Sequence, residues 1–214
     1  MEMTVFVNAV ANTIAILIHT NICKPLVANI AGIALDFVKQ NWRVNKGKEL
    51  AMPEFFICAK NQVHKKVKQL DITHLVTLID PGAYIFKPNS IPPENWLWLR
   101  FEDDEDPCGV SPPNLWHAER ILDVGKQFPQ DARVLVHCHA GICRSTAAAL
   151  ALWLQANGTD RLEEAVEWLA SERPLSCPNM LLASFFDDLL EMNGEFKKAC
   201  DKIGENSVKQ KFSI

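Results

Sequence analysis

Apolar and polar positions change in blocks along residues 52–191, and the blocks predict short strands separated by helices. Continuous apolar runs rich in β-branched and aromatic residues predict strands at 54–58, 73–79, 96–101 and 133–137. Apolar residues at helical spacing, with proline or aspartate start signals, predict helices at 61–70, 111–128, 144–156, 161–171 and 178–191. Strands that alternate with helices predict an α/β fold with a largely parallel central sheet flanked by helices. Functional residues of such a sheet gather at the carboxyl ends of its strands.

Residues 1–50 have a different pattern, and we expect an apolar helical N-terminal extension and linker there. No charged residue occurs from Met3 to Cys23, and Asp36 is the only one in 26–38, where apolar residues share one helical face. The chain opens with Met-Glu-Met, and its apolar run contains several polar residues, so neither a secretory signal nor a membrane span is predicted. We expect a helix that packs on the main domain (51–205) or on a second copy in a homodimer. Association with a membrane surface is the alternative, and 206–214 are expected to form a C-terminal tail.

Composition narrows the class of protein and its compartment. The chain has 214 residues, 48% hydrophobic and 22% charged, values that are ordinary for a soluble globular protein. The net charge of −4 and the absence of a basic block give no reason to expect a nucleic-acid partner. Seven cysteines, an odd number without framework spacing, indicate a reducing compartment and therefore a cytoplasmic location.

The stretch Arg-Val-Leu-Val-His-Cys-His-Ala-Gly-Ile-Cys-Arg-Ser-Thr at 133–146 contains the candidate chemistry. A strand delivers Cys138 to a short loop that ends at Arg144, where a helix begins; residues 138–144 are called the Cys138 loop below. Backbone N–H groups of such a loop and the positive end of the helix form a site for a phosphate-sized anion. Arg144 adds a planar fork for two anion oxygens, and the same positive field favours the reactive thiolate of Cys138. Gly141 provides the backbone freedom that a tightly curled loop needs.

Two other interpretations explain this stretch less well. His137, Cys138, His139 and Cys143 could be metal ligands, but zinc ligands usually come as two distant pairs and no second pair occurs. Arg144 would also repel a cation, so no metal or other cofactor is expected. A merely structural buried cysteine leaves Gly141 and Arg144 unexplained.

His137, Cys138, Gly141, Arg144 and Ser145 match the signature His-Cys-x5-Arg-Ser/Thr, so the chain resembles the cysteine-dependent protein tyrosine and dual-specificity-like phosphatases. The resemblance is to a small, bacterial-type member. It extends over about 51–205 and includes Arg173 and Pro178-Asn179, which are similar to a region that the family packs behind the phosphate site; for Asn179 we expect at most a supporting role.

The resemblance implies a role for each residue of the stretch. Cys138 is the nucleophile, Ser145 stabilises its thiolate when it leaves, and His137 orients the loop through backbone hydrogen bonds. The phosphate is bound by the loop residues His139, Ala140, Gly141, Ile142, Cys143 and Arg144. No metal is required.

A phosphate monoester also needs an acid that protonates the leaving oxygen, and the resemblance implies an aspartate on a loop before the cysteine. Residues 101–107, Phe-Glu-Asp-Asp-Glu-Asp-Pro, follow a predicted strand and are called the acidic loop below. Such a run is most often only a solvated loop. Aligned on the strand end, the family pattern falls on Asp103, with Asp104 and then Asp106 as rivals. Neighbouring carboxylates disfavour one another's charged forms, which helps an acid to keep its proton.

Cys143 departs from most dual-specificity-like loops and is similar to the second cysteine in the loop of low-molecular-weight tyrosine phosphatases. One hypothesis is a reversible disulfide between Cys138 and Cys143 that protects the thiolate from over-oxidation. The alternative is that Cys143 packs as a small apolar side chain under the loop. Peptide mapping after peroxide treatment distinguishes the two, since only sulfonic acid at Cys138 would contradict the disulfide.

The sequence thus predicts a metal-independent phosphatase that acts on phosphotyrosine, alone or together with phosphoserine and phosphothreonine, through a phosphocysteine intermediate. A phosphatase of non-protein monoesters is one alternative, although His139 is the only additional basic residue in the loop. A catalytically silent phosphate-recognising module is another, and sulfur transfer is a third. Tyr84 or Phe86, after the second strand, could stack on a substrate ring or simply pack locally.

Overall fold

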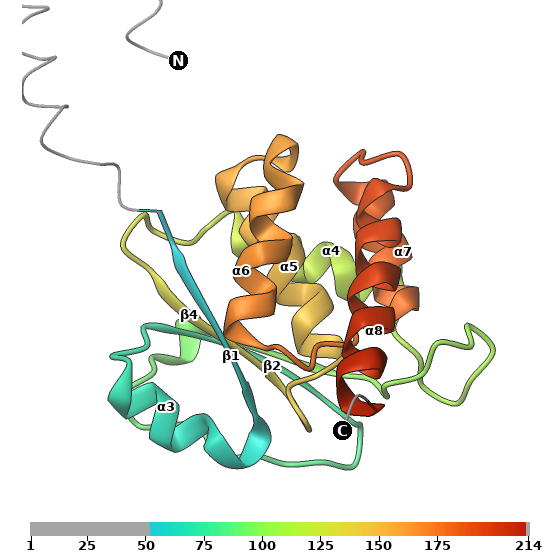
Figure 1. The fold of residues 1–214 in the computed structure, drawn as a ribbon. Helices are drawn as coiled ribbons and strands as arrows, with labels where there is room; N and C mark the ends of the chain where they lie inside the picture. The colour runs from blue at the N-terminus through green and yellow to red at the C-terminus, as the bar shows by residue number, and fades with distance from the viewer. Residues whose placement is uncertain (1–51, 213–214) are drawn as a thin grey trace, which may run out of the picture. The chain divides into compact units, whose positions relative to one another are not determined.

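Four parallel strands form the centre of the structure, a computed structural model that describes residues 52–212 (Figure 1). They are β1 (Glu54–Ala59), β2 (His74–Ile79), β3 (Trp96–Arg100) and β4 (Arg133–Cys138), in the order β1-β4-β2-β3. The register pairs Cys58 with His137 and His137 with Thr77, so the carboxyl ends of neighbouring strands lie at one edge of the sheet. The predicted α/β fold with a parallel, helix-flanked sheet is therefore confirmed.

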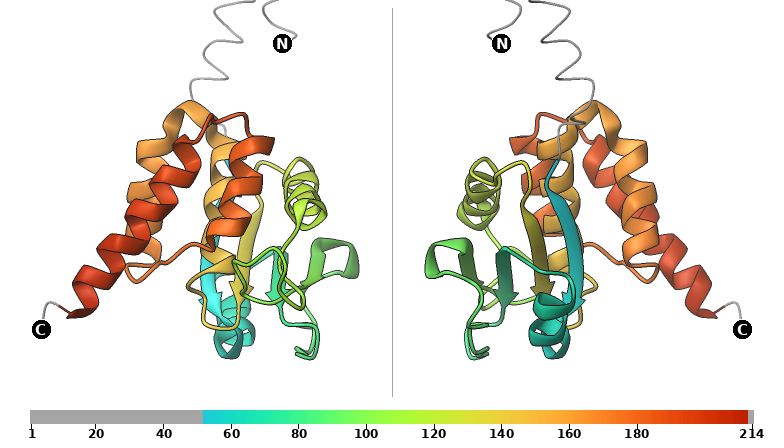
Figure 2. Two further views of the ribbon diagram at one scale, coloured as in Figure 1. Left: turned by 90° about the vertical axis from the view of Figure 1, so that its right-hand side faces the viewer. Right: turned by 90° about the vertical axis from the view of Figure 1, so that its left-hand side faces the viewer.

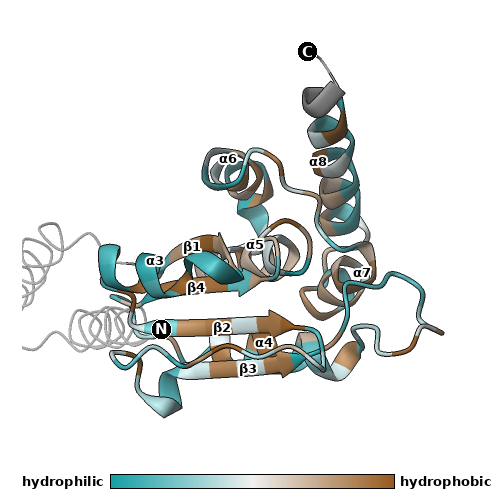
Figure 3. Ribbon diagram, turned by 90° about the horizontal axis from the view of Figure 1, so that it is seen from below, coloured by the Kyte–Doolittle hydropathy of each residue, from teal (hydrophilic) through white to brown (hydrophobic). Residues whose placement is uncertain are grey.

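Successive side chains of a strand point to opposite faces, and each face of this sheet has its own hydrophobic core. One core contains Val134 and Val136 of β4 and is covered by five helices. These helices are α4 (Leu115–Gly125), α5 (Arg144–Asn157), α6 (Leu162–Glu172), α7 (Met180–Leu189) and α8 (Glu195–Phe212). The other core contains Leu135 and is covered by α3 (Val63–Gln69), which lies on the opposite face of the sheet from the other helices (Figure 1). Figure 3 shows the contrast between apolar strands and the largely hydrophilic α3.

The helices α6 and α8 lie side by side within the layer of five helices (Figure 2). Short 3-10 helices, η1 (Lys60–Gln62), η2 (Pro93–Asn95) and η3 (Thr159–Arg161), connect the main elements. Within residues 52–212, no helix combines the length and apolar character that crossing a membrane requires.

Four helix starts differ from the sequence prediction. α3 begins at Val63 rather than at 61, because residues 60–62 form η1. α4 begins at Leu115 rather than near 111, because the Asn114 side chain accepts the backbone N–H of His117 at 3.2 Å and caps the helix there. α7 begins at Met180, capped in the same way by Asn179. Asp160 does not cap α6, because it lies within η3.

α8 has no counterpart among the predicted helices, and it continues beyond residue 206 to Phe212. Its sequence is polar on average, and it is held in place by its packing against α7 and α6. The helix predicted within residues 1–50 lies outside the described residues, as does the end of the expected C-terminal tail.

Asp187 joins α7 to α8 through a buried carboxylate. It is 6% exposed and accepts the backbone N–H groups of Gly194 at 2.5 Å, Phe196 at 2.9 Å and Lys197 at 3.3 Å. These amides belong to the start of α8 and the turn before it, where N–H groups have no partner within the helix. Asp187 therefore fixes the point at which α8 begins.

We predict that Asp187→Ala lowers the free energy of unfolding by about 2 kcal/mol, since a charge-assisted acceptor is removed and buried amides lose their partner. Urea denaturation measures the change. Asp188→Ala, at the exposed neighbouring aspartate, is the matched control and should change stability by about 0.5 kcal/mol or less. Equal effects of the two substitutions would show that Asp187 does not hold α8.

Candidate active site

The Cys138 loop connects the end of β4 to the first turn of α5, as predicted. Cys138 is 1% exposed, and its Sγ atom lies 3.2 Å from the Ser145 Oγ atom. The Gly141 backbone N–H donates to the same sulfur at 3.2 Å. The loop therefore curls around the sulfur, and both groups stabilise negative charge on it, as does the positive end of α5.

Gly141 is required by both conformation and space. Its φ angle is +70°, in the left-handed region, where a residue with a side chain is strained. A Cβ atom added there would lie 2.6 Å from the carbonyl carbon and oxygen of Cys58. The loop is also tied to the end of β1 by the Lys60 N–H, which donates to the His139 carbonyl at 3.0 Å. The Cys138 loop therefore packs directly against the end of β1.

Arg173, at the end of α6, fixes the loop from behind. Its Nε and Nη2 atoms donate to the carbonyl oxygens of Gly141 at 2.9 Å and Ala140 at 3.0 Å. A peptide whose carbonyl is bonded on one side directs the following N–H to the other side. Arg173 thus favours the arrangement in which loop amides are free to face an anion.

Arg144 is buried, with 2% exposure, and its guanidinium contacts residues that follow two other strands. Its Nη1 atom donates to Asp80 Oδ1 at 2.7 Å, after β2, and to the Phe101 carbonyl at 2.6 Å, after β3. Its buried Nε atom has no hydrogen-bond partner, and Asp103 Oδ2 lies 3.9 Å from it. A buried donor without a partner, beside the loop amides, is suited to an anion oxygen.

Asp80 is a further residue of the site that no sequence motif identifies. Besides its bond to Arg144, its Oδ2 atom lies 3.1 Å from His139 Nε2, although that contact lacks the alignment of a hydrogen bond. The signal that could have found it is its position as the first acidic residue after a buried strand whose carboxyl end adjoins β4.

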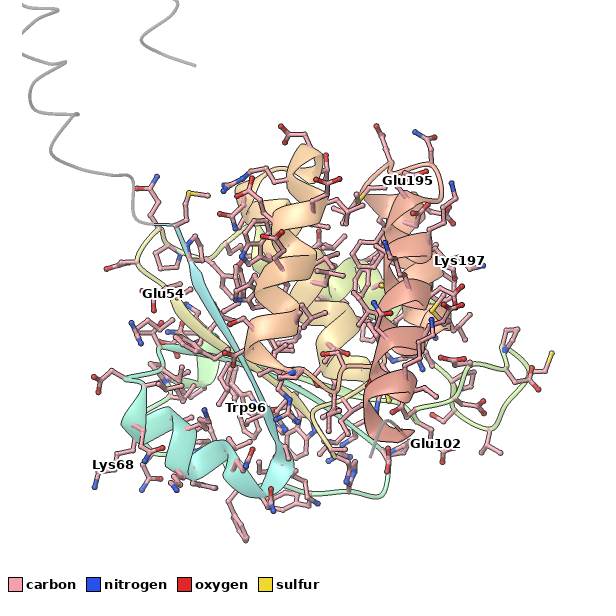
Figure 4. All side chains as sticks on the ribbon, in the orientation of Figure 1. Glu54, Lys68, Trp96, Glu102, Glu195 and Lys197 are labelled. Atoms are coloured by element: carbon pink, nitrogen blue, oxygen red, sulfur yellow. The ribbon has the colours of Figure 1, made fainter. Side chains whose placement is uncertain are left out.

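Three hydrogen-bonded side chains from neighbouring strands, Trp96, Thr77 and His137, lead to the backbone carbonyl of Cys138. Trp96, at the start of β3 (Figure 4), donates from Nε1 to Thr77 Oγ1 at 2.8 Å, and Thr77 Oγ1 lies 2.8 Å from His137 Nε2. Burial lowers the pKa of His137 to about 4, so the ring is neutral at pH 7. The Cys138 carbonyl, 3.2 Å from Nδ1, only accepts, so Nδ1 carries the ring proton and Nε2 accepts from Thr77.

Asp103 lies at the site, on the acidic loop that starts after β3. Its Oδ1 atom accepts Nδ2–H of Asn179 at 3.0 Å, and its Oδ2 atom faces Arg144. The Asp103 carboxylate also acts on the neighbouring Cys143 thiol. The pKa of that thiol is raised, first by burial and then by the carboxylate, so Cys143 is neutral.

The two rival aspartates are bonded within the acidic loop instead. Asp104 Oδ1 accepts the backbone N–H of Asp106 at 3.0 Å, and Asp106 Oδ1 accepts that of Cys108 at 2.9 Å. A Cβ atom at Gly109 would lie 2.0 Å from Asp104 Oδ2, which shows that this carboxylate points back into the loop. Of the three aspartates, Asp103 is therefore the one with a contact to Arg144.

Cys138 and Cys143 are both free thiols. The hypothesis of a disulfide between them stays a prediction, as does stacking of Tyr84 on a substrate ring. Tyr84 is 58% exposed and packs edge-on against Phe86 and Trp98, with centroids 5.1 Å and 5.6 Å away. Within residues 52–212, no group of three or more His, Cys, Asp or Glu side chains is arranged to hold a metal ion.

Parts of the chain match dual-specificity protein phosphatases in sequence, although no protein-family model matches it. It is 36% identical over 79 residues to mouse dual specificity protein phosphatase 2, an alignment that covers 37% of this chain and 24% of that protein. It is 38% identical over 80 residues to human dual specificity protein phosphatase 4, covering 37% and 19%. The longer match to human dual specificity protein phosphatase 16 is 26% identical over 171 residues, or 79% of this chain and 24% of that protein.

Solved structures show the same fold. A variant of human DUSP28 superposes with a TM-score of 0.52 at 18% identity, over 67% of this chain and 93% of that one. DUSP15 superposes with a TM-score of 0.51 at 17% identity, over 72% and 93%. The resemblance to a dual-specificity-phosphatase-like family is therefore confirmed. The chain spans about a quarter or less of the curated relatives that it matches, 24% of one and 19% of another.

The neutral, buried state of His137 predicts a pH dependence of stability. In the unfolded chain its pKa is near 6.5, and in the fold it is about 4, so the unfolded state binds more protons between these values. The contribution to stability is complete above pH 6.5 and declines as the pH falls towards 4, by about 3 kcal/mol in total.

We predict that urea denaturation from pH 7 to 4 shows a steeper loss of stability for the wild type than for His137→Asn. Other protonations affect both proteins and cancel in the difference. His64→Asn, at an exposed histidine of α3, is the control and should keep the wild-type profile. Parallel profiles for the wild type and His137→Asn would contradict a neutral His137.

Proposed function

We propose that this chain is a phosphatase that hydrolyses phosphate monoesters through a phosphocysteine at Cys138, without a metal ion. The proposal is supported by the arrangement of groups around the Cys138 sulfur. The Gly141 amide of the Cys138 loop and the Ser145 hydroxyl in the first turn of α5 face the Cys138 sulfur. At the end of the same loop, the buried Nε atom of Arg144 has no hydrogen-bond partner. A nucleophile on the floor of an anion site is what phosphoryl transfer to sulfur requires.

In the first step the Cys138 thiolate attacks phosphorus, the bond to the leaving oxygen breaks, and Asp103 donates its proton to that oxygen. The loop amides and Arg144 stabilise the charge on the three equatorial oxygens, the role that metal ions have in other phosphoryl-transfer sites. Because Arg144 is already held by Asp80 and Phe101, it needs little rearrangement when the anion binds.

In the second step water attacks the phosphocysteine, and Asp103, now a carboxylate, accepts the proton of that water. The phosphorus–sulfur bond breaks, and the sulfur leaves as a thiolate. The Ser145 hydroxyl, 3.2 Å from that sulfur, donates to it and stabilises its charge. The products are inorganic phosphate and the free enzyme.

The substrate class that we propose is phosphotyrosine in proteins, with phosphoserine and phosphothreonine as further substrates. The carboxylates of Asp80 and Asp103 adjoin Arg144, and they would repel a ligand that carries several phosphates. His139 is the one additional basic side chain within the loop. Both observations favour a single phosphate on a protein side chain over a polyphosphorylated small molecule.

The direct test is hydrolysis of p-nitrophenyl phosphate at pH 5 to 8 with EDTA present, by the wild type and by Cys138→Ser. We expect turnover by the wild type and its loss, by at least about 10⁴-fold, in Cys138→Ser, because a hydroxyl of normal acidity replaces a thiolate. Cys108→Ser, at an exposed cysteine outside the Cys138 loop, is the matched control and should retain wild-type rates. A reduced wild type without turnover would leave the silent phosphate-recognising module as the better interpretation.

A second test separates the three aspartates by leaving group. Phenolate needs a proton when it leaves and p-nitrophenolate needs it far less. Asp103→Asn should therefore lower kcat on phenyl phosphate by about 10²- to 10⁴-fold and affect p-nitrophenyl phosphate less. Asp104→Asn and Asp106→Asn, matched changes in the same loop, should lower both rates by similar, small factors. A selective loss in Asp104→Asn instead would transfer the acid role to Asp104.

A further inference from the structure

Asn179 connects the acidic loop to the Cys138 loop, and we propose that it is a positioning residue for the acid Asp103. This inference rests on the phosphatase function proposed above. Asn179 is 1% exposed, although it is polar. Its side-chain Nδ2 donates to Asp103 Oδ1 at 3.0 Å and to the Asp104 carbonyl at 3.3 Å, and its backbone N–H donates to the Cys143 carbonyl at 3.3 Å.

The cap of α7 determines which end of the amide meets Asp103. Asn179 Oδ1 accepts the backbone N–H of Leu182 at 2.9 Å, at the first turn of the helix. A backbone N–H only donates, so the oxygen of the amide must face the helix and its NH₂ group must face the acidic loop. The orientation of the donor is therefore set by the start of α7.

This bond also distinguishes the two oxygens of Asp103. Because Oδ1 accepts from Asn179 in both the charged and the protonated carboxyl, the acid proton belongs on Oδ2. That oxygen lies 3.9 Å from Arg144 Nε, the unpaired donor beside the Cys138 loop. Asn179 thus turns the proton-bearing oxygen towards the place where the leaving group departs.

The Asp103 carboxylate needs this hydrogen bond to keep one orientation. The Asp103 side chain is 33% exposed and lies on a loop of polar residues, so its orientation is not fixed by packing. Two further bonds hold the same loop: Glu102 N–H to the Ser111 carbonyl at 2.7 Å, and Met180 N–H to Glu105 Oε1 at 2.8 Å. Neither of them touches the Asp103 carboxylate, whereas Asn179 bonds to it directly.

The experiment compares kcat and KM of Asn179→Ser on phenyl phosphate and p-nitrophenyl phosphate. Serine is an equally good N-cap, so α7 keeps its start while Asp103 loses its donor. We expect kcat on phenyl phosphate to fall about tenfold, with less than about a twofold change on p-nitrophenyl phosphate and an unchanged KM. In an Asp103→Asn background, Asn179→Ser should cause no further selective loss.

Asn114→Ser is the matched control, because Asn114 caps α4 in the same manner and has no bond to Asp103. It should leave the ratio of the two rates at the wild-type value. Asn179→Thr is a second variant that keeps an acceptor for Leu182 and lacks the amide donor, and it should show the same selective loss.

A loss of equal size on both substrates, or no loss, in both Asn179 variants would overturn the positioning role and leave the phosphatase function intact. Absence of turnover in the wild type would overturn the proposed function, and this inference with it. The two failures are therefore distinguishable in one set of assays.

Discussion

The buried guanidinium of Arg144 is the contact on which the arrangement of the site depends. A charge with 2% exposure must be paired, because an isolated buried ion is strongly unfavourable. Asp80 after β2 and the Phe101 carbonyl after β3 provide the partners, while Arg144 itself opens α5 after β4. One side chain therefore joins the ends of three strands, and it can do so only because the sheet is parallel and these ends meet at one edge.

Cys138 and Asp103, the proposed nucleophile and the proposed acid, are positioned by different layers of the fold. Cys138 is fixed from the sheet, through the Trp96–Thr77–His137 chain and the approach of Gly141 to β1. Asp103 is fixed from the helical layer, through the start of α7. Arg144 contacts both Asp80, after strand β2, and Asp103, on the acidic loop that α7 holds. A change in how α7 packs should accordingly affect proton donation before it affects the thiolate, and a change in the sheet should do the opposite.

Much of this architecture is predictable from the sequence, because its signals are local. The apolar runs around 134–136 and 75–79 specify buried parallel strands, and Cys138, Gly141 and Arg144 specify the loop between strand and helix. Asp80 and the role of Asn179 are not predictable in this way. Each depends on contacts between segments distant in sequence, Asp80 with Arg144 and Asn179 with Asp103. The sequence does not predict α8, because this segment is polar and lacks a strong apolar face, and its start is set by Asp187.

The central claim is that phosphate is transferred to Cys138 itself, and the most direct measurement is to trap that species. Ser145→Ala removes the hydroxyl that we propose stabilises the departing thiolate, so breakdown of the intermediate should become slow. The variant is mixed with p-nitrophenyl phosphate, quenched in acid within one turnover, digested and examined by mass spectrometry. The account predicts one phosphoryl group on the peptide that contains Cys138. A phosphoryl group on another residue, or p-nitrophenol released with no protein-bound phosphoryl group at any time, would contradict it.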